Sequence, residues 1–260
     1  MIRYILDKIR KDIFSRGTLF KLIGLLFILC CWQAATWSLG QLAIASPYQT
    51  FVAFFSMSLS DYFQDNFLIT LRRLFFGIGI GSLVGFFLGI SAGLYEDVKN
   101  FLELFIWILM SIPPVVVTVL AMLWFGMGST MVVFIASLML MPFVYINVIK
   151  GMELIDENLM EMTDIYRYSF MMKLWHLYIP AISAPLLAAM SIVTSNGVRV
   201  VVLAELLGAL DGIGYAISIT RSNLEVAELF AWVLATLLVV AFFQYVALKP
   251  LQEYFLRWKT

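Results

Sequence analysis

One strongly polar stretch, residues 150–183, interrupts a chain that otherwise consists of long apolar runs. A segment this rich in charge cannot lie in hydrocarbon and must face water. Its apolar residues recur at helical spacing, which predicts two short amphipathic helices. Asp156 and Ser169 stand where their side-chain oxygens could cap the first turns of these helices. The charged and histidine side chains of the stretch are Lys150, Glu153, Asp156, Glu157, Glu161, Asp164, Arg167, Lys173 and His176.

The two predicted helices would each expose an apolar stripe, and an exposed stripe needs a covering surface. The pattern is compatible with two surfaces that could cover these stripes. A protein partner could receive the helices, or the helices could lie flat on the lipid headgroups.

The apolar runs are long enough to cross a bilayer, which takes about 20 residues each. Of the 260 residues, 62% are hydrophobic and 13% are charged, whereas a soluble domain is nearer half apolar and a quarter charged. The sequence therefore predicts an all-α, polytopic membrane protein without room for a large soluble domain. Six spans are expected, at about residues 19–39, 69–95, 101–124, 131–148, 184–203 and 226–248.

Glycines and prolines predict local features of these spans. A glycine at every fourth position from Gly77 to Gly93 places small residues on one helix face, where a second helix can approach closely. Pro113 and Pro114 lack backbone donors, so the third span should kink or break there. Residues 40–67 predict a connector with a surface helix, and the Gly-rich residues 204–224 predict a connector that could hold a short re-entrant helix.

Basic residues are distributed unequally over the two sides of the membrane. With six spans, both chain ends, the 95–100 turn and residues 150–183 share one side, which holds 13 of the 17 Lys and Arg. The positive-inside rule therefore places both termini and the polar stretch in the cytoplasm. Residues 1–18 predict an amphipathic helix on the membrane surface, and residues 249–260 predict a basic amphipathic tail.

Several chemistries have no support in the sequence. The GxxxxGK[ST] loop that binds nucleotide phosphates is missing, so this chain is not expected to hydrolyse ATP. Cys30 and Cys31 are adjacent, which suits neither a disulfide framework nor a CxxC metal site. His176 is the only histidine and lacks metal-ligand partners. We therefore expect neither a cofactor nor a metal in this chain, and the net charge of zero gives no support for a nucleic-acid partner.

Within the polar stretch, Glu161-Met162-Thr163 is followed at fixed spacing by Arg167, Leu177 and Ile179-Pro180. This spacing resembles the cytoplasmic signature loop of permease subunits of binding-protein-dependent ABC importers. That loop reads Glu-Ala-Ala, three residues, Gly, nine residues, Ile, one residue, Leu-Pro. Arg167 stands where the family usually has Gly. Because Gly adopts bends that are costly for Arg, we expect the turn to have a different backbone conformation here.

Further motifs extend the resemblance over most of the chain. In order, they are TLRR at 70–73, IPP at 112–114, LWFG at 123–126, AELLG at 204–208, GIGY at 212–215 and LRW at 256–258. As a set they look like the nitrate, sulfonate and taurine branch of that family. The resemblance implies a type I ABC importer permease fold in the bacterial plasma (inner) membrane. It also implies one transmembrane permease domain over residues 19–248, with a cytoplasmic coupling-helix loop at 150–183.

The same resemblance implies partners for this chain. The coupling loop would dock on a separate ABC ATPase subunit, present in two copies, which binds the ATP and Mg. A periplasmic or lipid-anchored substrate-binding protein would deliver the solute, and a second permease copy would complete a homodimer. The residues expected to dock on the ATPase are Glu161, Asp164, Arg167, Ser169, Lys173, Leu174, His176 and Pro180.

Arg199 is the main candidate for contact with a small anion such as nitrate, a sulfonate or taurine. It lies inside a predicted span, where charges usually face a cavity or a partner. Ser195, Asn196 and Glu205 are further candidates for the solute pathway. Alternatively, Arg199 could be structural, in an ion pair across helices with Glu205 or reaching toward the outer surface. Arg72-Arg73 is interpreted as an outer-surface anchor.

Three alternative functions stay open at this point. The same architecture could carry a vitamin precursor or another heterocycle. A secondary transporter would need several intramembrane acids and an internal repeat, but the central spans contain almost no acids and no repeat is evident. A membrane scaffold would not need the docking loop.

Overall fold

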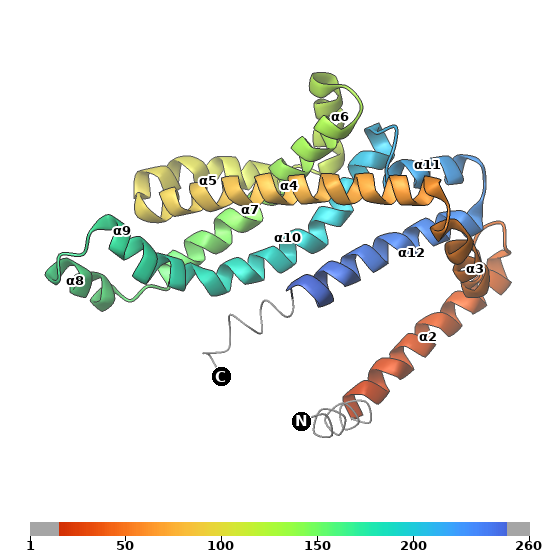
Figure 1. Ribbon diagram of the computed structural model, residues 1–260, viewed down its shortest axis with the longest axis horizontal. Coiled ribbons are helices and arrows are strands. Elements are labelled where there is room, and N and C mark those ends of the chain that lie inside the picture. Colours follow the sequence, from red (N-terminus) through yellow and green to blue (C-terminus); the bar gives the residue numbers. More distant parts are fainter. Residues whose placement is uncertain (1–15, 249–260) are drawn as a thin grey trace. The chain divides into compact units, whose positions relative to one another are not determined.

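The computed structural model describes residues 16–248, and every regular element in this range is a helix (Figure 1). The all-α class is thereby confirmed for the described part of the chain. Residues 1–15 of the predicted surface helix and the whole predicted tail, 249–260, lie outside the described residues.

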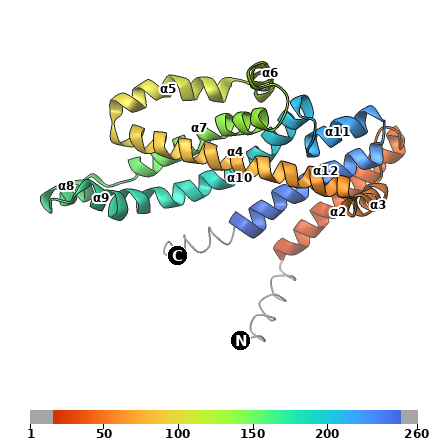
Figure 2. The same cartoon turned by 45° about the horizontal axis from the view of Figure 1, so that its top comes forward.

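Three long helices pack together: α4 (Asp61–Leu94), α7 (Ser129–Glu153) and α10 (Ile179–Gly208). The middle helix, α7, contacts both others, and the three lie side by side in both views (Figures 1 and 2). Many of the most deeply buried large side chains come from these helices. They include Leu74, Ile135, Leu140, Val144, Ile182 and Val193.

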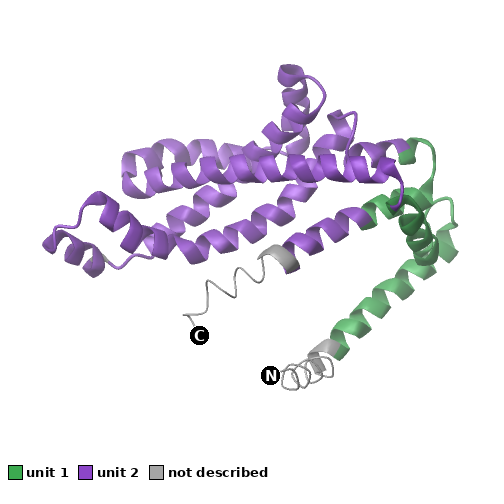
Figure 3. Ribbon diagram, viewed as in Figure 1, with its two compact units in different colours: residues 1–58, 220–234 green, residues 59–219, 235–260 purple. Residues whose placement is uncertain are grey.

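The chain forms two compact units (Figure 3). Unit 1 comprises residues 1–58 and 220–234, and unit 2 comprises residues 59–219 and 235–260. The three long helices belong to unit 2. The expectation of a single permease domain over residues 19–248 stays a prediction.

The glycines of α4 allow its backbone to touch the backbone of α7. A Cβ atom at Gly81 would lie 2.7 Å from the carbonyl oxygen of Ser137, and one at Gly85 would lie 2.5 Å from that of Met141. Real Cβ atoms essentially never approach so closely. The glycine face is therefore a packing surface, as predicted, and its partner is a helix of the same subunit.

The third predicted span is broken rather than straight. Helix α5 (Glu96–Ser111) and helix α6 (Pro114–Phe125) meet at an angle of 101°. The break falls at the Pro113-Pro114 pair, as predicted from the missing backbone donors. Helix α5 packs back on α4 and α7 around a core of Ala92, Ile106, Met141, Tyr145 and Ile149.

The polar stretch starts in the last turn of α7 and continues as helix α8 (Glu157–Ile165) and helix α9 (Phe170–Lys173). The side chain of Asp156 accepts a hydrogen bond from the Asn158 N–H at 2.9 Å. The Ser169 hydroxyl accepts one from the Met172 N–H at 3.4 Å. Both predicted N-caps are confirmed.

The second helix of the polar stretch is not a separate short helix, so that part of the prediction is wrong. It continues through a π-helical turn, η1 (Leu174–Tyr178), into α10, giving a helix of 39 residues from Phe170 to Gly208. In this turn the Ile179 N–H bonds to the Leu174 carbonyl. Pro180 then falls in the first turn of α10, where its missing N–H is tolerated.

Helix α11 (Ile213–Ser222) is the short helix predicted within residues 204–224. It is followed by α12 (Val226–Phe242) and a π-helical segment, η2 (Phe243–Leu248). Unit 1 also contains α2 (Arg16–Leu39) and α3 (Pro47–Ser58). There, the Trp32 Nε1–H donates to the Ala45 carbonyl at 2.9 Å, and the Trp32 ring stacks on Phe230.

Five helices in residues 16–248 are long and apolar enough to cross a membrane, or six if the bent α5–α6 pair is one span. About six spans were predicted, and this is confirmed. One boundary was wrong, because α4 begins at Asp61 rather than near Ile69. The Ser60 hydroxyl accepts from the Phe63 N–H at 3.2 Å and caps the helix. Residues 61–67 therefore belong to a helix of span length and not to the connector.

Candidate functional site

The polar stretch presents a group of exposed apolar side chains, which we name the loop patch. Its most exposed members are Ile165, at 79% of its maximal accessibility, Leu154, at 73%, and Tyr166, at 70%. Apolar exposure of this extent marks a surface that contacts another molecule. The full loop patch consists of Leu154, Leu159, Met162, Ile165, Tyr166, Phe170, Met171, Met172 and Trp175.

Beneath the loop patch, α8 is held to the following helix by its own contacts. The Tyr178 side chain is buried, and its hydroxyl donates to the Met160 sulfur at 3.7 Å. Thr163 is also buried. An ion pair between Lys173 and Asp164 joins α9 to α8. The polar stretch is thus a folded structure, which presents the loop patch in a defined geometry.

The turn between α8 and α9 is a Schellman motif with Arg167 at its left-handed position. Arg167 has φ = +52°. The Tyr168 N–H bonds to the Thr163 carbonyl at 2.9 Å, and the Arg167 N–H bonds to that of Asp164 at 3.0 Å. This is the hydrogen-bond pattern in which Gly usually occupies the left-handed position. The expectation of a different backbone conformation in this turn is therefore wrong, because Arg167 adopts the left-handed bend for which Gly is suited.

The predicted docking residues all lie on this loop or at the start of α10. Lys173 and Leu174 are half-buried, whereas the other six are exposed: Glu161, Asp164, Arg167, Ser169, His176 and Pro180. The geometry places them around the loop patch, and their role in docking stays a prediction.

A second site lies inside unit 2 and was missed in the sequence. Arg73 of α4 is 2% exposed, so its interpretation as an outer-surface anchor is wrong. Its guanidinium forms ion pairs with Glu205, at 2.9 Å, and with Asp211. It also donates to the Asp211 carbonyl and, twice, to the Ser129 hydroxyl. This arginine cluster joins α4, α7, α10 and the segment that leads into α11.

The arginine cluster extends to the N-terminus of α11. Three consecutive backbone N–H groups, those of Gly212, Ile213 and Gly214, donate to the side chains of Asn66, Thr70 and Glu205 respectively. Helix N-termini leave such donors unpaired and carry positive partial charge, which a carboxylate offsets. Side chains from two other helices therefore cap and fix α11.

The geometry assigns Glu205 to this cluster and not to a solute pathway. Its carboxylate is buried and accepts from Thr70, Arg73 and Gly214, with heavy-atom distances of 2.9 to 3.0 Å. The ion pair of Glu205 across helices exists, but its partner is Arg73 and not Arg199. The one signal for this pairing in the sequence is that Arg73 and Glu205 lie at the predicted outer ends of two spans, which does not by itself select them as partners.

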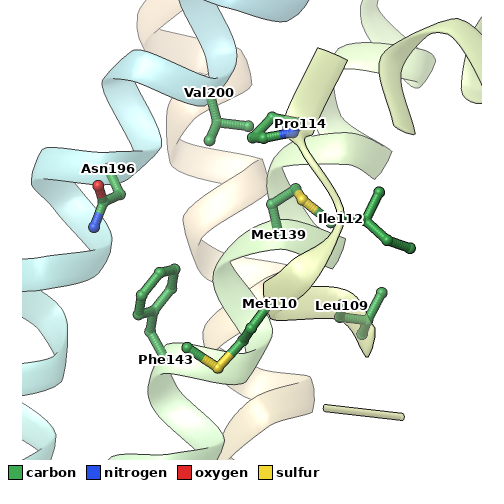
Figure 4. A pocket seen from close by; sticks show the side chains of 8 residues that line it. All are labelled: Leu109, Met110, Ile112, Pro114, Met139, Phe143, Asn196 and Val200. Carbon is green, nitrogen blue, oxygen red and sulfur yellow. The ribbon is translucent and has the colours of Figure 1, made fainter. Parts of the chain in front are cut away.

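The remaining pathway candidates lie on α10. Arg199 is exposed and forms no ion pair with any residue between 16 and 248. Ser195 donates a hydrogen bond to Gln244 of η2 at 3.4 Å. Asn196 lines a cavity between α10, α7 and the broken α5–α6 span (Figure 4).

This cavity is mainly apolar. Figure 4 shows Asn196 and Val200 on the α10 side and residues of the broken span on the other. Its lining consists of Leu109, Met110, Ile112, Pro114, Met139, Phe143, Asn196 and Val200. Within residues 16–248, no group of His, Cys, Asp or Glu is arranged to hold a metal ion.

Residues 81–250 match the family described as binding-protein-dependent transport system inner membrane component. The SsuC protein of Bacillus subtilis (strain 168), whose name includes the words aliphatic sulfonates transport permease protein, is 25% identical over 213 residues, covering 80% of this chain and 76% of the relative. The taurine transport system permease protein TauC of Escherichia coli (strain K12) is 24% identical over 244 residues, covering 91% and 88%.

A solved structure shares the fold. It is a bacterial ABC transporter involved in the import of the acidic polysaccharide alginate. The TM-score is 0.60 at 16% identity, covering 92% of this chain and 98% of that one.

Proposed function

This chain belongs to the family of binding-protein-dependent transport system inner membrane components, and from that premise we propose that it forms the translocation path for a small anion, such as nitrate, a sulfonate or taurine. The fold is that of a type I ABC importer permease, and the chain is a multi-pass membrane protein. It is a permease subunit, and the ATPase of such an importer is a separate subunit. The secondary-transporter and scaffold alternatives are therefore set aside.

We propose that the loop patch docks in a groove of an ABC ATPase subunit on the cytoplasmic side. The single observation that carries this proposal is the exposure of the loop patch on a folded, polar loop at the end of the span helices. An apolar surface surrounded by charge suits a protein groove with an apolar floor and a polar rim. Of the two coverings that the sequence left open, we favour the protein partner.

The charged residues around the loop patch would form the rim of this contact. Glu161, Arg167 and His176 are exposed and available to a partner, while Lys173 and Asp164 already pair with each other. Rim charges contribute more to orientation and association rate than to affinity. Leu174, which follows α9 directly, is half-buried.

We propose that this chain works with ATPase subunits, a second permease copy and a binding protein. Two ATPase copies would bind ATP and Mg and drive two permease copies between inward-open and outward-open states. A periplasmic or lipid-anchored binding protein would deliver the solute to the outer face. Both chain ends of the permease would be cytoplasmic.

The names of the relatives support the choice of solute, since they refer to aliphatic sulfonates and to taurine. Arg199 is exposed on a span and forms no ion pair within residues 16–248, which suits an anion, because a guanidinium binds oxyanions through several donors at once. A vitamin precursor or another heterocycle is the alternative solute within the same architecture.

The docking proposal is tested with an Ile165→Asp variant. Ile165 is 79% exposed, so the change should leave the fold intact while placing a charge in the contact. We expect the variant to insert into the membrane normally, to lose the co-purifying ATPase and to lose ATP-dependent uptake. A Leu174→Asp variant should do the same.

The matched control is Leu42→Asp, at a position that is 91% exposed and distant in sequence from the polar stretch. It should keep both the ATPase and uptake. If the Ile165→Asp and Leu174→Asp variants retained the ATPase and full uptake, the docking proposal would be wrong.

A thermal-shift panel on the cognate binding protein tests the solute. We expect stabilisation by taurine, an alkanesulfonate or nitrate. Stabilisation only by pyrimidines or flavins would select the heterocycle alternative.

A further inference from the structure

The cavity beside the broken span has backbone groups that the helix itself cannot satisfy. Helix α5 ends at Ser111 and α6 begins at Pro114. In an unbroken helix, residues 113 and 114 would donate to the carbonyls of Leu109 and Met110, but both are prolines and have no N–H. Irregular backbone at membrane depth is tolerated where it is buried in protein or lines a water-filled cavity. Leu109 and Met110 line this cavity.

Asn196 is the only polar side chain among the eight that line the cavity, and none of the eight is charged. It is partly buried, and its amide forms no hydrogen bond to a residue between 16 and 248. An amide offers two donors and one acceptor. The Asn196 amide is not among the polar groups that are buried without a partner within residues 16–248, so it is open to the space of the cavity. The cavity therefore presents one accessible amide within an apolar wall.

We propose that this cavity contacts the uncharged, organic part of the transported solute, with Asn196 as its hydrogen-bonding residue. The inference rests on the proposed function and narrows its solute class. Seven apolar side chains cannot solvate an ion, and burying an unpaired charge among them is costly. The site therefore suits a solute with an apolar body, such as an alkanesulfonate, and disfavours inorganic nitrate.

The walls of the cavity suit chains of varied length. Met110 and Met139 contribute flexible thioether side chains, which adapt to different apolar shapes. They come from the broken span and from α7, so a solute between them would touch two elements as well as α10. Any charged group of the solute would have to lie outside this cavity.

The first test measures whether position 196 is accessible to a water-soluble reagent in the assembled transporter. An Asn196→Cys variant is made in a Cys30→Ser/Cys31→Ser background and reconstituted in proteoliposomes with the ATPase and the binding protein. A charged, water-soluble methanethiosulfonate is the label. We expect labelling during ATP turnover, with hexanesulfonate slowing it at least threefold and nitrate having no effect.

The matched control is Leu104→Cys on α5, where the side chain is 61% exposed but does not line the cavity. It should not be labelled, because we expect it to face lipid. If the Asn196→Cys variant were not labelled, or if hexanesulfonate gave no protection, a lipid chain or a second permease copy would fill the cavity instead. The proposal would then be overturned.

Uptake gives the second test. Asn196→Leu removes the amide at similar volume, and we expect about a tenfold loss of hexanesulfonate uptake at low concentration, since one hydrogen bond is lost. Asn147→Leu is the matched control, because Asn147 bonds to the Phe143 carbonyl and does not line the cavity. Its uptake should stay within twofold of the unsubstituted protein.

The outcomes separate this inference from the proposed function. If the unsubstituted assembly shows no ATP-dependent uptake of any probe, the proposed function fails, and this inference fails with it. If that assembly transports hexanesulfonate but Asn196→Leu behaves like Asn147→Leu, only the cavity inference is overturned.

Discussion

At the scale of single residues, Arg167 and Arg73 are each held in a state that arginine usually avoids. Arg167 takes a left-handed backbone conformation at the end of α8, and Arg73 is withdrawn from water inside unit 2. The first costs backbone energy and the second costs desolvation. Each cost leads to a measurable expectation.

Replacing Arg167 by Gly should stabilise the loop. A left-handed L-residue costs about 1–2 kcal/mol, and Gly largely avoids that cost. We expect slower hydrogen exchange of the Tyr168 amide, which closes the Schellman motif, by about fivefold. Arg167→Ala is the control, because it removes the guanidinium but keeps the Cβ atom. If Ala slowed exchange as much as Gly, the side chain and not the backbone would be the source of the strain.

Replacing one partner of the Arg73–Glu205 pair should destabilise unit 2 strongly. Leaving one buried charge unpaired costs about 3–5 kcal/mol. We expect Arg73→Met and Glu205→Met each to lower the melting temperature of the detergent-purified protein substantially. The Arg73→Met/Glu205→Met double variant should recover part of the loss, since neither charge is then left alone. Recovery should be incomplete, because Arg73 also binds Asp211 and Ser129. Additive losses would contradict this account.

At the scale of secondary-structure elements, the glycine face of α4 sets how closely α7 can pack. Gly85→Ala should destabilise the protein by about 1–3 kcal/mol, because the new methyl group would overlap the Met141 carbonyl. Gly79→Ala on the same helix is the control, since nothing lies within 4 Å of a Cβ there. It should be neutral or stabilise by up to about 1 kcal/mol through helix propensity. Equal melting temperatures for the two variants would contradict a packing role.

The elements differ in how far the sequence could predict them. Composition and periodicity were sufficient for the spans, for the break at Pro113-Pro114 and for the caps at Asp156 and Ser169, because each depends on local chemistry. The continuity from α9 into α10 was missed, since Pro180 suggests a boundary and only a π-helical turn avoids one. The arginine cluster was also missed. Its members come from positions 66 to 214, and only tertiary packing brings them together.

At the scale of the whole molecule, the arginine cluster, the loop patch and the Asn196 cavity predict a division of roles. The arginine cluster fixes α11 to α4 and α10, whereas the loop patch and the Asn196 cavity both lack a partner within residues 16–248. A permease that changes shape during transport needs rigid parts and contact surfaces. We therefore interpret the cluster as part of the rigid scaffold, and the loop patch and cavity as the places where partner and solute act.

Arg199 belongs to none of these three sites, and its position predicts a role that only the assembled transporter reveals. It is exposed on a span and has no ion pair within residues 16–248. A charge left in hydrocarbon at the centre of a span costs at least about 2.5–3.5 kcal/mol, so Arg199 should face a water-filled path or a second permease copy. If Arg199 lines a water-filled path, Arg199→Gln should raise the KM for an alkanesulfonate roughly tenfold without loss of the ATPase. Arg199→Lys keeps the charge and should raise the KM less.

Arg72→Gln is the matched control for this prediction, since Arg72 is an exposed arginine in the first half of another span helix, α4. It should leave the KM unchanged. If Arg199→Gln instead reduced the yield of assembled transporter while the remaining fraction kept its KM, Arg199 would be holding two permease copies together. The anion would then be recognised by the binding protein alone. Because a path residue changes affinity for the solute and an interface residue changes assembly, measuring the KM and the yield on the same preparation decides between the two roles.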